Sequence, residues 1–268
     1  MEILQLLNFK KFYSVSGFYF ENFNFGKITN GSFRSVSLSQ NITFLHLQEC
    51  NITQIESDAL LGLRHLSELF IQDVKDNKKG ISYLSYYRLH HCPNISVIGF
   101  GKVRYLEIKT FSALPNLKRL DVRHKSLLKY EGAISYIKRL EILYLNGIGL
   151  RKIPSFIPSS TPWIHSLKLD NNFITTLSFN GSFKTSKDFW LSVRNNKITK
   201  ITKAEMSQFK HAASLALNLK ENDVRELEKD FLEDIKILTE INLEQNIHFG
   251  NKNFFNMINN LNNKTIIR

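Results

Sequence analysis

Hydrophobic residues recur along the chain in one short pattern, which is called the frame below. The clearest copy spans 164–177 and reads L-x-x-L-x-L-x-x-N-x-I-x-x-L, with Ile at the first position. Its x-L-x-L-x segment alternates with a period of two, which predicts a short strand with leucines pointing inward and intervening side chains pointing outward. The asparagine three residues later is expected to turn the chain away from the strand and to hydrogen-bond the backbone of that turn.

The frame repeats about every 24 residues through most of the chain, as in a solenoid. The second inward position of each copy is predicted at Phe23, Leu45, Leu69, Ile98, Leu120, Leu143, Leu167, Leu191, Leu217 and Ile241. No such unit can bury its apolar face alone, so neighbouring units must stack. The pattern predicts an α/β solenoid of about nine or ten repeats, with a concave parallel β-sheet and an irregular or short-helical convex side.

The spacing also predicts the domain organisation. We expect an N-terminal flank over 1–19 and a single solenoid over 20–268, truncated or weakly capped at its C-terminus. One longer interval indicates an insertion near 75–94. Insertions in repeats often form functional loops. Alternatively, the segment is a repeat that has diverged in sequence, with its tyrosines filling the convex core. We expect this second interpretation to be correct.

The asparagine position divides the chain into a regular and an irregular part. A structural ladder is predicted from Asn172, Asn196, Asn222 and Asn246. Earlier copies carry other residues there, namely Cys50, Val74, Val103, Lys125 and Ile148. The backbone groups of those turns therefore need other partners, and the N-terminal half should be less regular.

This motif and its spacing resemble the leucine-rich repeat superfamily, and in particular the 24-residue class of Toll-like receptor ectodomains and related extracellular proteins. Segments 60–66 and 111–117 match the F-x-x-L-x-x-L tail of that class in part. The resemblance covers about residues 20–268. It implies a non-catalytic module that recognises a protein or another macromolecule on its concave sheet, with no cofactor.

Outward positions of the central copies are basic and aromatic. The candidate ligand-binding residues are Arg119, Arg123, His124, Tyr144, Lys168, Trp190 and Arg194. Arginine and aromatic side chains supply much of the binding energy at protein interfaces, and an outward tryptophan is otherwise an unusual exposed apolar group. The alternative is that these long side chains only solvate the sheet.

The charge balance adds a second kind of partner. The 36 Lys and Arg exceed the 24 Asp and Glu, for a net charge of +12, so a nucleic acid or sulfated glycan could bind the basic central strands with steep salt dependence. Acidic residues on either side interrupt such a track, which favours a protein partner. A nucleophile elbow, a phosphate loop and a zinc-helix signature are all missing from the sequence, so we expect no enzyme.

The two cysteines exclude a disulfide-stapled scaffold. His90, His91 and Cys92 form a short run of metal-binding residue types, but we expect no metal site. Adjacent residues in a regular segment cannot all face one ion, and a fourth ligand is not evident.

The compartment has two interpretations. Asn-x-Ser/Thr sequons, which suit an extracellular or cell-surface protein, occur at Asn30, Asn41, Asn51, Asn94, Asn180 and Asn263. A signal peptide and cysteine-rich caps are not visible, so an intracellular adaptor or scaffold in a reducing compartment is the alternative. No apolar run approaches the length that crosses a bilayer.

Overall fold

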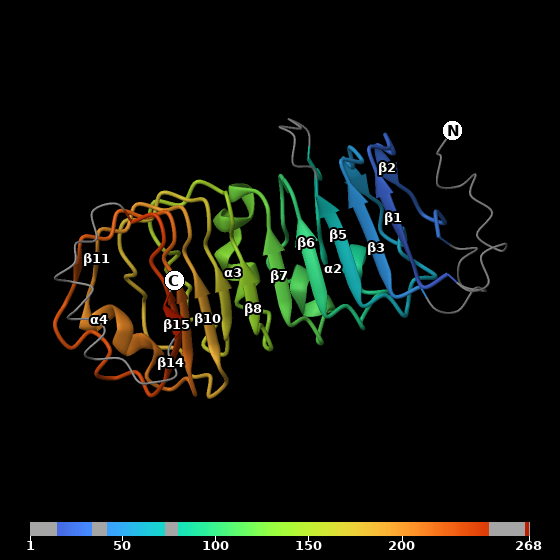
Figure 1. The fold of residues 1–268 in the computed structure, drawn as a ribbon. Coiled ribbons are helices and arrows are strands. Elements are labelled where there is room, and N and C mark those ends of the chain that lie inside the picture. The colour runs from blue at the N-terminus through green and yellow to red at the C-terminus, as the bar shows by residue number, and fades with distance from the viewer. Residues whose placement is uncertain (1–14, 34–41, 73–79, 247–265, 268) are drawn as a thin grey trace. The chain divides into compact units, whose positions relative to one another are not determined.

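The computed structural model describes residues 15–33, 42–72, 80–246 and 266–267. They belong to two compact units, residues 1–140 and 141–268, called unit 1 and unit 2 below. Each unit is a parallel β-solenoid with little helix, in which one short strand per repeat lies beside the strand of the next repeat (Figure 1). The predicted fold class is confirmed.

Unit 1 contains one main sheet and a small second sheet. Its elements are β1 (Gly17–Glu21), β2 (Lys27–Ile28), β3 (Phe44–Gln48), β4 (Gln54–Ile55), β5 (Glu68–Gln72), α2 (Tyr86–Leu89), β6 (Val97–Phe100), η3 (Thr110–Ala113), β7 (Arg119–Val122), η4 (Lys125–Tyr130) and α3 (Glu131–Ile134). The main sheet runs β1-β3-β5-β6-β7, all parallel, and β2 pairs with β4.

Unit 2 repeats the arrangement. Its elements are β8 (Ile142–Tyr144), β9 (Ser166–Lys168), β10 (Phe189–Ser192), β11 (Lys200–Ile201), α4 (Lys203–Met206), η5 (Ser207–Phe209), β12 (Leu215–Asn218), β13 (Glu226–Leu227), β14 (Leu238–Asn242) and β15 (Ile266–Ile267). The main sheet runs β8-β9-β10-β12-β14-β15, and β11 pairs with β13.

The alternating pattern puts one face of every strand in the core. In β3 and β5 the burial alternates strictly, with Leu45, Leu47 and Leu69 at most 1% exposed. The same frame buries Leu143, Leu167, Leu191, Leu217 and Ile241 completely or nearly so. Burying each such side chain contributes about 1.5–3 kcal/mol, so stacking of repeats, rather than any single repeat, stabilises each unit.

A left-handed residue precedes the asparagine position in several repeats. Asn171, Asn195 and Glu221 have φ of 57°, 52° and 60°, and Glu49 has the same geometry before Cys50. A positive φ is uncommon outside glycine and asparagine. It turns the backbone sharply at the end of the strand and places the next side chain inside the turn.

The first repeat differs from its prediction. Phe18 pairs with Leu45 and Phe20 with Leu47, so Phe18 rather than Phe23 takes the second inward position. Phe23 is 44% exposed. The phenylalanine-rich segment fits two frames equally well, and pairing with β3 selects the earlier one. As a result β1 begins inside the segment predicted as an N-terminal flank.

The region of the insertion also differs. Leu84 and Leu89 fill the core there, whereas Tyr86 and Tyr87 are 37% and 64% exposed. The prediction that the tyrosines fill the convex core is therefore wrong for these two. The single turn of α2 directs Leu89 inward and leaves Tyr86 and Tyr87 on its outer side. Residues 75–79 of the predicted insertion lie outside the described residues.

Candidate recognition surface

The outward face of unit 2 holds a lysine between two aromatic rings. Tyr144 and Lys168 are partners in the β8–β9 register, and Trp190 lies one strand further along, level with Ser166. The Lys168 Nζ is 4.5 Å from the ring centroid of Tyr144 and 4.5 Å from that of Trp190. Both distances are within the range of cation–π attraction. We call these three residues the Lys168 cluster.

Trp190 remains partly open to solvent in this cluster. It is 37% exposed, although it occupies a strand position. Its two strand neighbours, Phe189 and Leu191, point inward and are at most 1% exposed, so the backbone of β10 fixes the direction of the indole. A large ring held in place by a rigid strand is suited to anchor a partner, because little side-chain entropy is lost when it binds.

Arg194 lies two residues beyond the end of β10 and is tied to an acid. Its Nη2 donates to Glu221 Oε1 at 2.7 Å, and its backbone N–H donates to Asp170 Oδ1 at 2.9 Å. The hydrogen bond to Glu221 raises the pKa of Arg194. Asp170 also accepts a hydrogen bond from Ser192 Oγ at 2.6 Å. The guanidinium is therefore held beside the strands of the Lys168 cluster rather than extended freely into solvent.

Unit 1 contains the other three predicted residues, and a buried carboxylate organises two of them. Asp121 is 2% exposed, and its two oxygens accept from Arg123 Nε at 3.1 Å and Nη2 at 3.2 Å, a bidentate pairing. Arg119 Nη2 lies 3.7 Å from the same carboxylate. Asp121, which the sequence analysis did not single out, therefore offsets one of the two positive charges of these arginines.

His124 makes a structural contact rather than pointing freely outward. Its Nδ1 accepts a hydrogen bond from the backbone N–H of Ser126, at the start of η4. Ser126 Oγ in turn accepts from the backbone N–H of Val103, 23 residues earlier. The serine thus satisfies a turn donor of the preceding repeat, next to Lys125 at the position where later repeats carry asparagine.

An aromatic row on unit 1 was missed by the sequence analysis. Tyr19, His46, Phe70 and Gly99 are successive register partners across β1, β3, β5 and β6. The rings of His46 and Phe70 meet edge to face at 4.8 Å, and the Arg119 guanidinium lies 5.9 Å from the Phe70 centroid. The signal for this row lies in the outward positions of the less regular N-terminal repeats.

The asparagines of unit 2 form a continuous set of buried bonds. Asn196 Nδ2 donates to Leu169 O at 3.0 Å and to Val193 O at 2.9 Å, and its Oδ1 accepts from the backbone N–H of Ile174 at 3.0 Å. Equivalent bonds are made by Asn172, Asn222 and Asn246. In unit 1, Cys50 Sγ contacts Phe20 O at 3.3 Å and Gln48 O at 3.2 Å, two carbonyls of the same kind of turn.

Three sequon asparagines are on the surface. Asn30, Asn94 and Asn180 are exposed and Asn51 is half-buried, while Asn41 and Asn263 lie outside the described residues. The side-chain amides of Asn94 and Asn180 donate to backbone carbonyls of Arg64 and Ser155. Neither bond buries the amide, so both sites are sterically open to modification.

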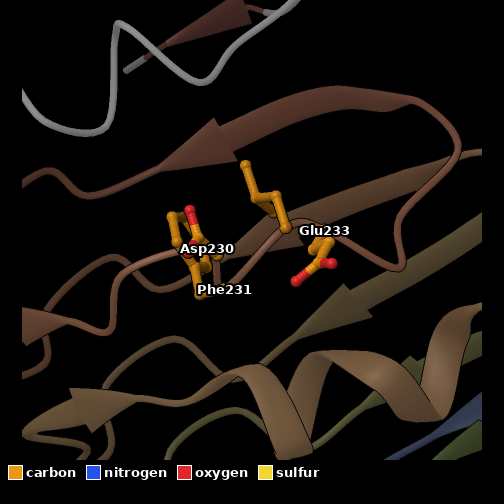
Figure 2. Close-up of a pocket in the computed structure, with 4 residues that line it drawn as sticks. Asp230, Phe231 and Glu233 are labelled. Atoms are coloured by element: carbon orange, nitrogen blue, oxygen red, sulfur yellow. The ribbon is translucent and has the colours of Figure 1, made fainter.

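An open hollow of about 460 Å³ lies at the turn after β13 (Figure 2). It is lined by Asp230, Phe231, Leu232 and Glu233. Glu233 is paired with Lys203, and that hydrogen bond raises the lysine pKa. The four described residues of this lining offer two carboxylates. None of the candidate ligand-binding residues lies in this lining.

One cluster of metal-binding residue types was not anticipated. Ligand atoms of Asp58, His90 and His91 lie within 4.8 Å of one another. Cys92, by contrast, is fully buried, and burial raises the pKa of its thiol to about 12. The two adjacent histidines thus lie close enough together to share one ligand site, with a third side chain from the preceding repeat, while Cys92 lies apart from them in the core.

Comparisons with known proteins identify the fold of the chain. No family model matches the chain. It is similar to the crystal structure of the TLR13–ssRNA13 complex, with a TM-score of 0.64 and 18% identity, over 90% of this chain and 34% of that one. The chain has the leucine-rich repeat fold. The mouse RP105/MD-1 complex gives a TM-score of 0.55 and 19% identity, over 85% of this chain and 32% of that one.

One curated relative of this leucine-rich repeat chain matches in sequence. The CD180 antigen of Mus musculus is 30% identical over 129 residues, which are 47% of this chain and 19% of the antigen. The chain thus spans about a fifth of that relative and about a third of the two structural neighbours. Among the described residues, no helix has the length and apolar character needed to cross a membrane.

Proposed function

We propose that the chain is a non-catalytic recognition module whose Lys168 cluster binds a protein partner. The observation that carries the proposal is the position of Lys168 Nζ, 4.5 Å from both the Tyr144 and Trp190 rings on the outward face of the sheet. Two aromatic faces and a cation held by three adjacent strands form a preorganised anchor of the kind that dominates interface energy.

The similarity to solved structures supports a macromolecular ligand. TLR13 was crystallised with a single-stranded RNA, and mouse RP105 with MD-1. These two structures of the same fold therefore include one complex with a nucleic acid and one with MD-1. For this chain the ion pairs favour a protein. Arg119 and Arg123 share Asp121, and Arg194 is bonded to Glu221, which leaves the basic strands less able to track a polyanion.

The binding proposal can be tested with matched tryptophan variants. The purified chain, immobilised as bait, would be exposed to surface and secreted proteins of the source cells, and retained proteins quantified by mass spectrometry. Trp190→Ala should lose a set of proteins that the wild type retains. Trp163→Ala is the control, because Trp163 is also exposed, at 54%, but lies outside the strands. Equal retention by both variants would refute the proposal.

The polyanion alternative has its own signature. Heparin and a single-stranded RNA would be titrated into the chain at about 50 and 200 mM salt. Binding that falls by orders of magnitude over that range, and that Trp190→Ala leaves unchanged, would replace the protein partner with a polyanion. Weak binding at both salt concentrations would support the protein.

We further propose an extracellular or cell-surface location. Exposed sequons at Asn30, Asn94 and Asn180 support it. The mass of the chain from eukaryotic secretory expression, before and after enzymatic removal of N-glycans, tests this directly. We expect sugar on Asn94 or Asn180, abolished by Asn94→Gln or Asn180→Gln. A folded chain that is secreted without sugar, or retained, would favour the intracellular adaptor instead.

A further inference from the structure

The convex side of unit 1 brings together three metal-binding side chains from two repeats. Asp58 lies in the turn after β4, and His90 and His91 directly follow α2. His91 Nε2 is 2.8 Å from Asp58 Oδ1, and each residue places a ligand atom within 4.8 Å of the other two. All three are half-buried, so the cluster is accessible from solvent but partly shielded.

The end of α2 explains how neighbouring histidines face the same way. His90 is the C-cap, with φ −63° and ψ −20°, so the chain is still in a tight helical turn. The two imidazole centroids lie 3.8 Å apart with a 40° angle between the ring planes. Cys92 points into the core, where its Sγ contacts Leu63 O at 3.4 Å. The third side chain therefore comes from the preceding repeat, as Asp58.

A backbone contact already orients one ring. His90 Nδ1 lies 2.9 Å from the carbonyl oxygen of Tyr87. A carbonyl can only accept, so Nδ1 carries the proton and the lone pair of the neutral ring is on Nε2. Metal-ligating histidines commonly donate their second ring N–H to a backbone carbonyl in this manner, which fixes the tautomer and the ring direction. The ring of Tyr87 packs edge to face against the His90 imidazole, with 6.0 Å between the two ring centroids.

We propose that Asp58, His90 and His91 bind a divalent transition-metal ion of the zinc class. Two imidazoles and a carboxylate are ligands that such ions accept, whereas magnesium and calcium prefer oxygen alone. Around a tetrahedral zinc ion with bonds of about 2.0–2.1 Å, ligand atoms stand ~3.4 Å apart. Reaching that spacing from the present arrangement requires small rotations of half-exposed side chains. Three protein ligands leave a fourth position for water or for a group from a partner.

The competing explanation is a plain ion pair between His91 and Asp58. The two can be separated with the full chain, treated with chelator and then titrated with zinc chloride, by calorimetry and by competition with a chromophoric chelator. We expect one zinc ion per chain. Asp58→Asn, which retains the shape of the side chain, and His91→Ala should each weaken binding by at least about 10-fold, since even outer-shell changes cost about 10–100-fold.

His211→Ala is the matched control, because His211 is an exposed histidine in unit 2. Its zinc affinity should equal that of the wild type. Zinc should also raise the melting temperature of the wild type and of His211→Ala by more than that of His91→Ala, because a ligand bound only to the native state stabilises it in proportion to its affinity. Melting in chelator alone confirms that each variant folds.

Two results would overturn the proposal. One is the absence of one-to-one zinc binding by the wild type. The other is binding that His91→Ala and Asp58→Asn, both shown to be folded, leave as strong as before, since this would place the ion on scattered surface histidines.

Discussion

The ring of Phe70 occupies the space that a Cβ on Gly99 would require, with Cδ1 only 2.4 Å from that position. The two residues are register partners on β5 and β6. A glycine inside a strand usually weakens it, and often marks the close approach of another group. Here the approaching group is an aromatic ring, which lies across the neighbouring strand near the Arg119 guanidinium.

Gly99→Ala should therefore destabilise unit 1 by about 1–3 kcal/mol, as overpacking does in a filled site. Urea unfolding measures the change. In a Phe70→Ala background the same substitution should cost less, because the remaining close atom is Nε2 at the far end of the flexible Gln72 side chain, at 2.6 Å. Gly132→Ala is the control, because the nearest atom there is the flexible end of Ile108 at 3.3 Å and alanine favours the helix. Equal costs with and without Phe70 would contradict this explanation.

Asn196→Ala should be strongly destabilising. It removes the partner of the buried Ile174 N–H and of two buried carbonyls, and each buried group left unsatisfied costs about 1–3 kcal/mol. Asn116→Ala, which removes an exposed amide bonded to Pro93 O, should cost far less. Chemical denaturation compares the two variants. Similar losses would mean that solvent replaces the ladder bonds.

Asp121→Asn should lower the stability of unit 1 by about 1.5–3 kcal/mol, the range for hydrogen bonds to charged groups. The amide cannot accept both bonds that Arg123 donates. Glu226→Gln removes the solvent-exposed pair with Lys200, and its effect should be small because such pairs contribute little. Thermal unfolding at low and high salt distinguishes them, because only the exposed pair should depend appreciably on salt.

Cys92 should be unreactive in the native state and should make stability fall at alkaline pH. Burial raises its pKa from 9.0 to about 12. Between these values the unfolded chain loses the thiol proton while the folded chain keeps it, so the free energy of unfolding decreases as pH rises from about 9 to 12. Alkylation followed by mass spectrometry at pH 8 tests reactivity. The decline with pH should be shallower in Cys92→Ala, and rapid native alkylation would contradict the prediction.

The sequence predicted the repeat and the core because strand alternation is a local property of the chain. Leu167, Leu191 and Leu217 occupy the inward positions that their spacing predicts. The first repeat was misplaced because Phe18 and Phe23 fit the same pattern, and only pairing with β3 separates them.

The surface was harder to predict, because it depends on distances between repeats. The outward direction of Lys168 and Trp190 follows from the frame, but the placement of one lysine between two rings does not. The repeat pattern predicts that the Asp121 side chain points outward, but it does not predict that two arginines lie against its carboxylate. Asp58 and His91 are in contact although they are 33 residues apart in the sequence. Because of the insertion this separation differs from the repeat length of about 24 residues, so the repeat spacing does not predict the contact.

Each ladder asparagine of unit 2 bonds a carbonyl of its own turn and also backbone groups of the turn before it. Asn172 satisfies Leu145 O and the N–H groups of Ile148 and Leu150, all in the turn before its own. Asn196, Asn222 and Asn246 likewise reach back to the preceding turn. Peeling a turn from the C-terminal side therefore leaves backbone groups of the preceding turn without partners, whereas peeling from the N-terminal side leaves the asparagine side chain of the next turn without partners. Under mechanical load, detaching a terminal turn from either end of unit 2 should therefore require breaking these buried bonds as well as those of the sheet.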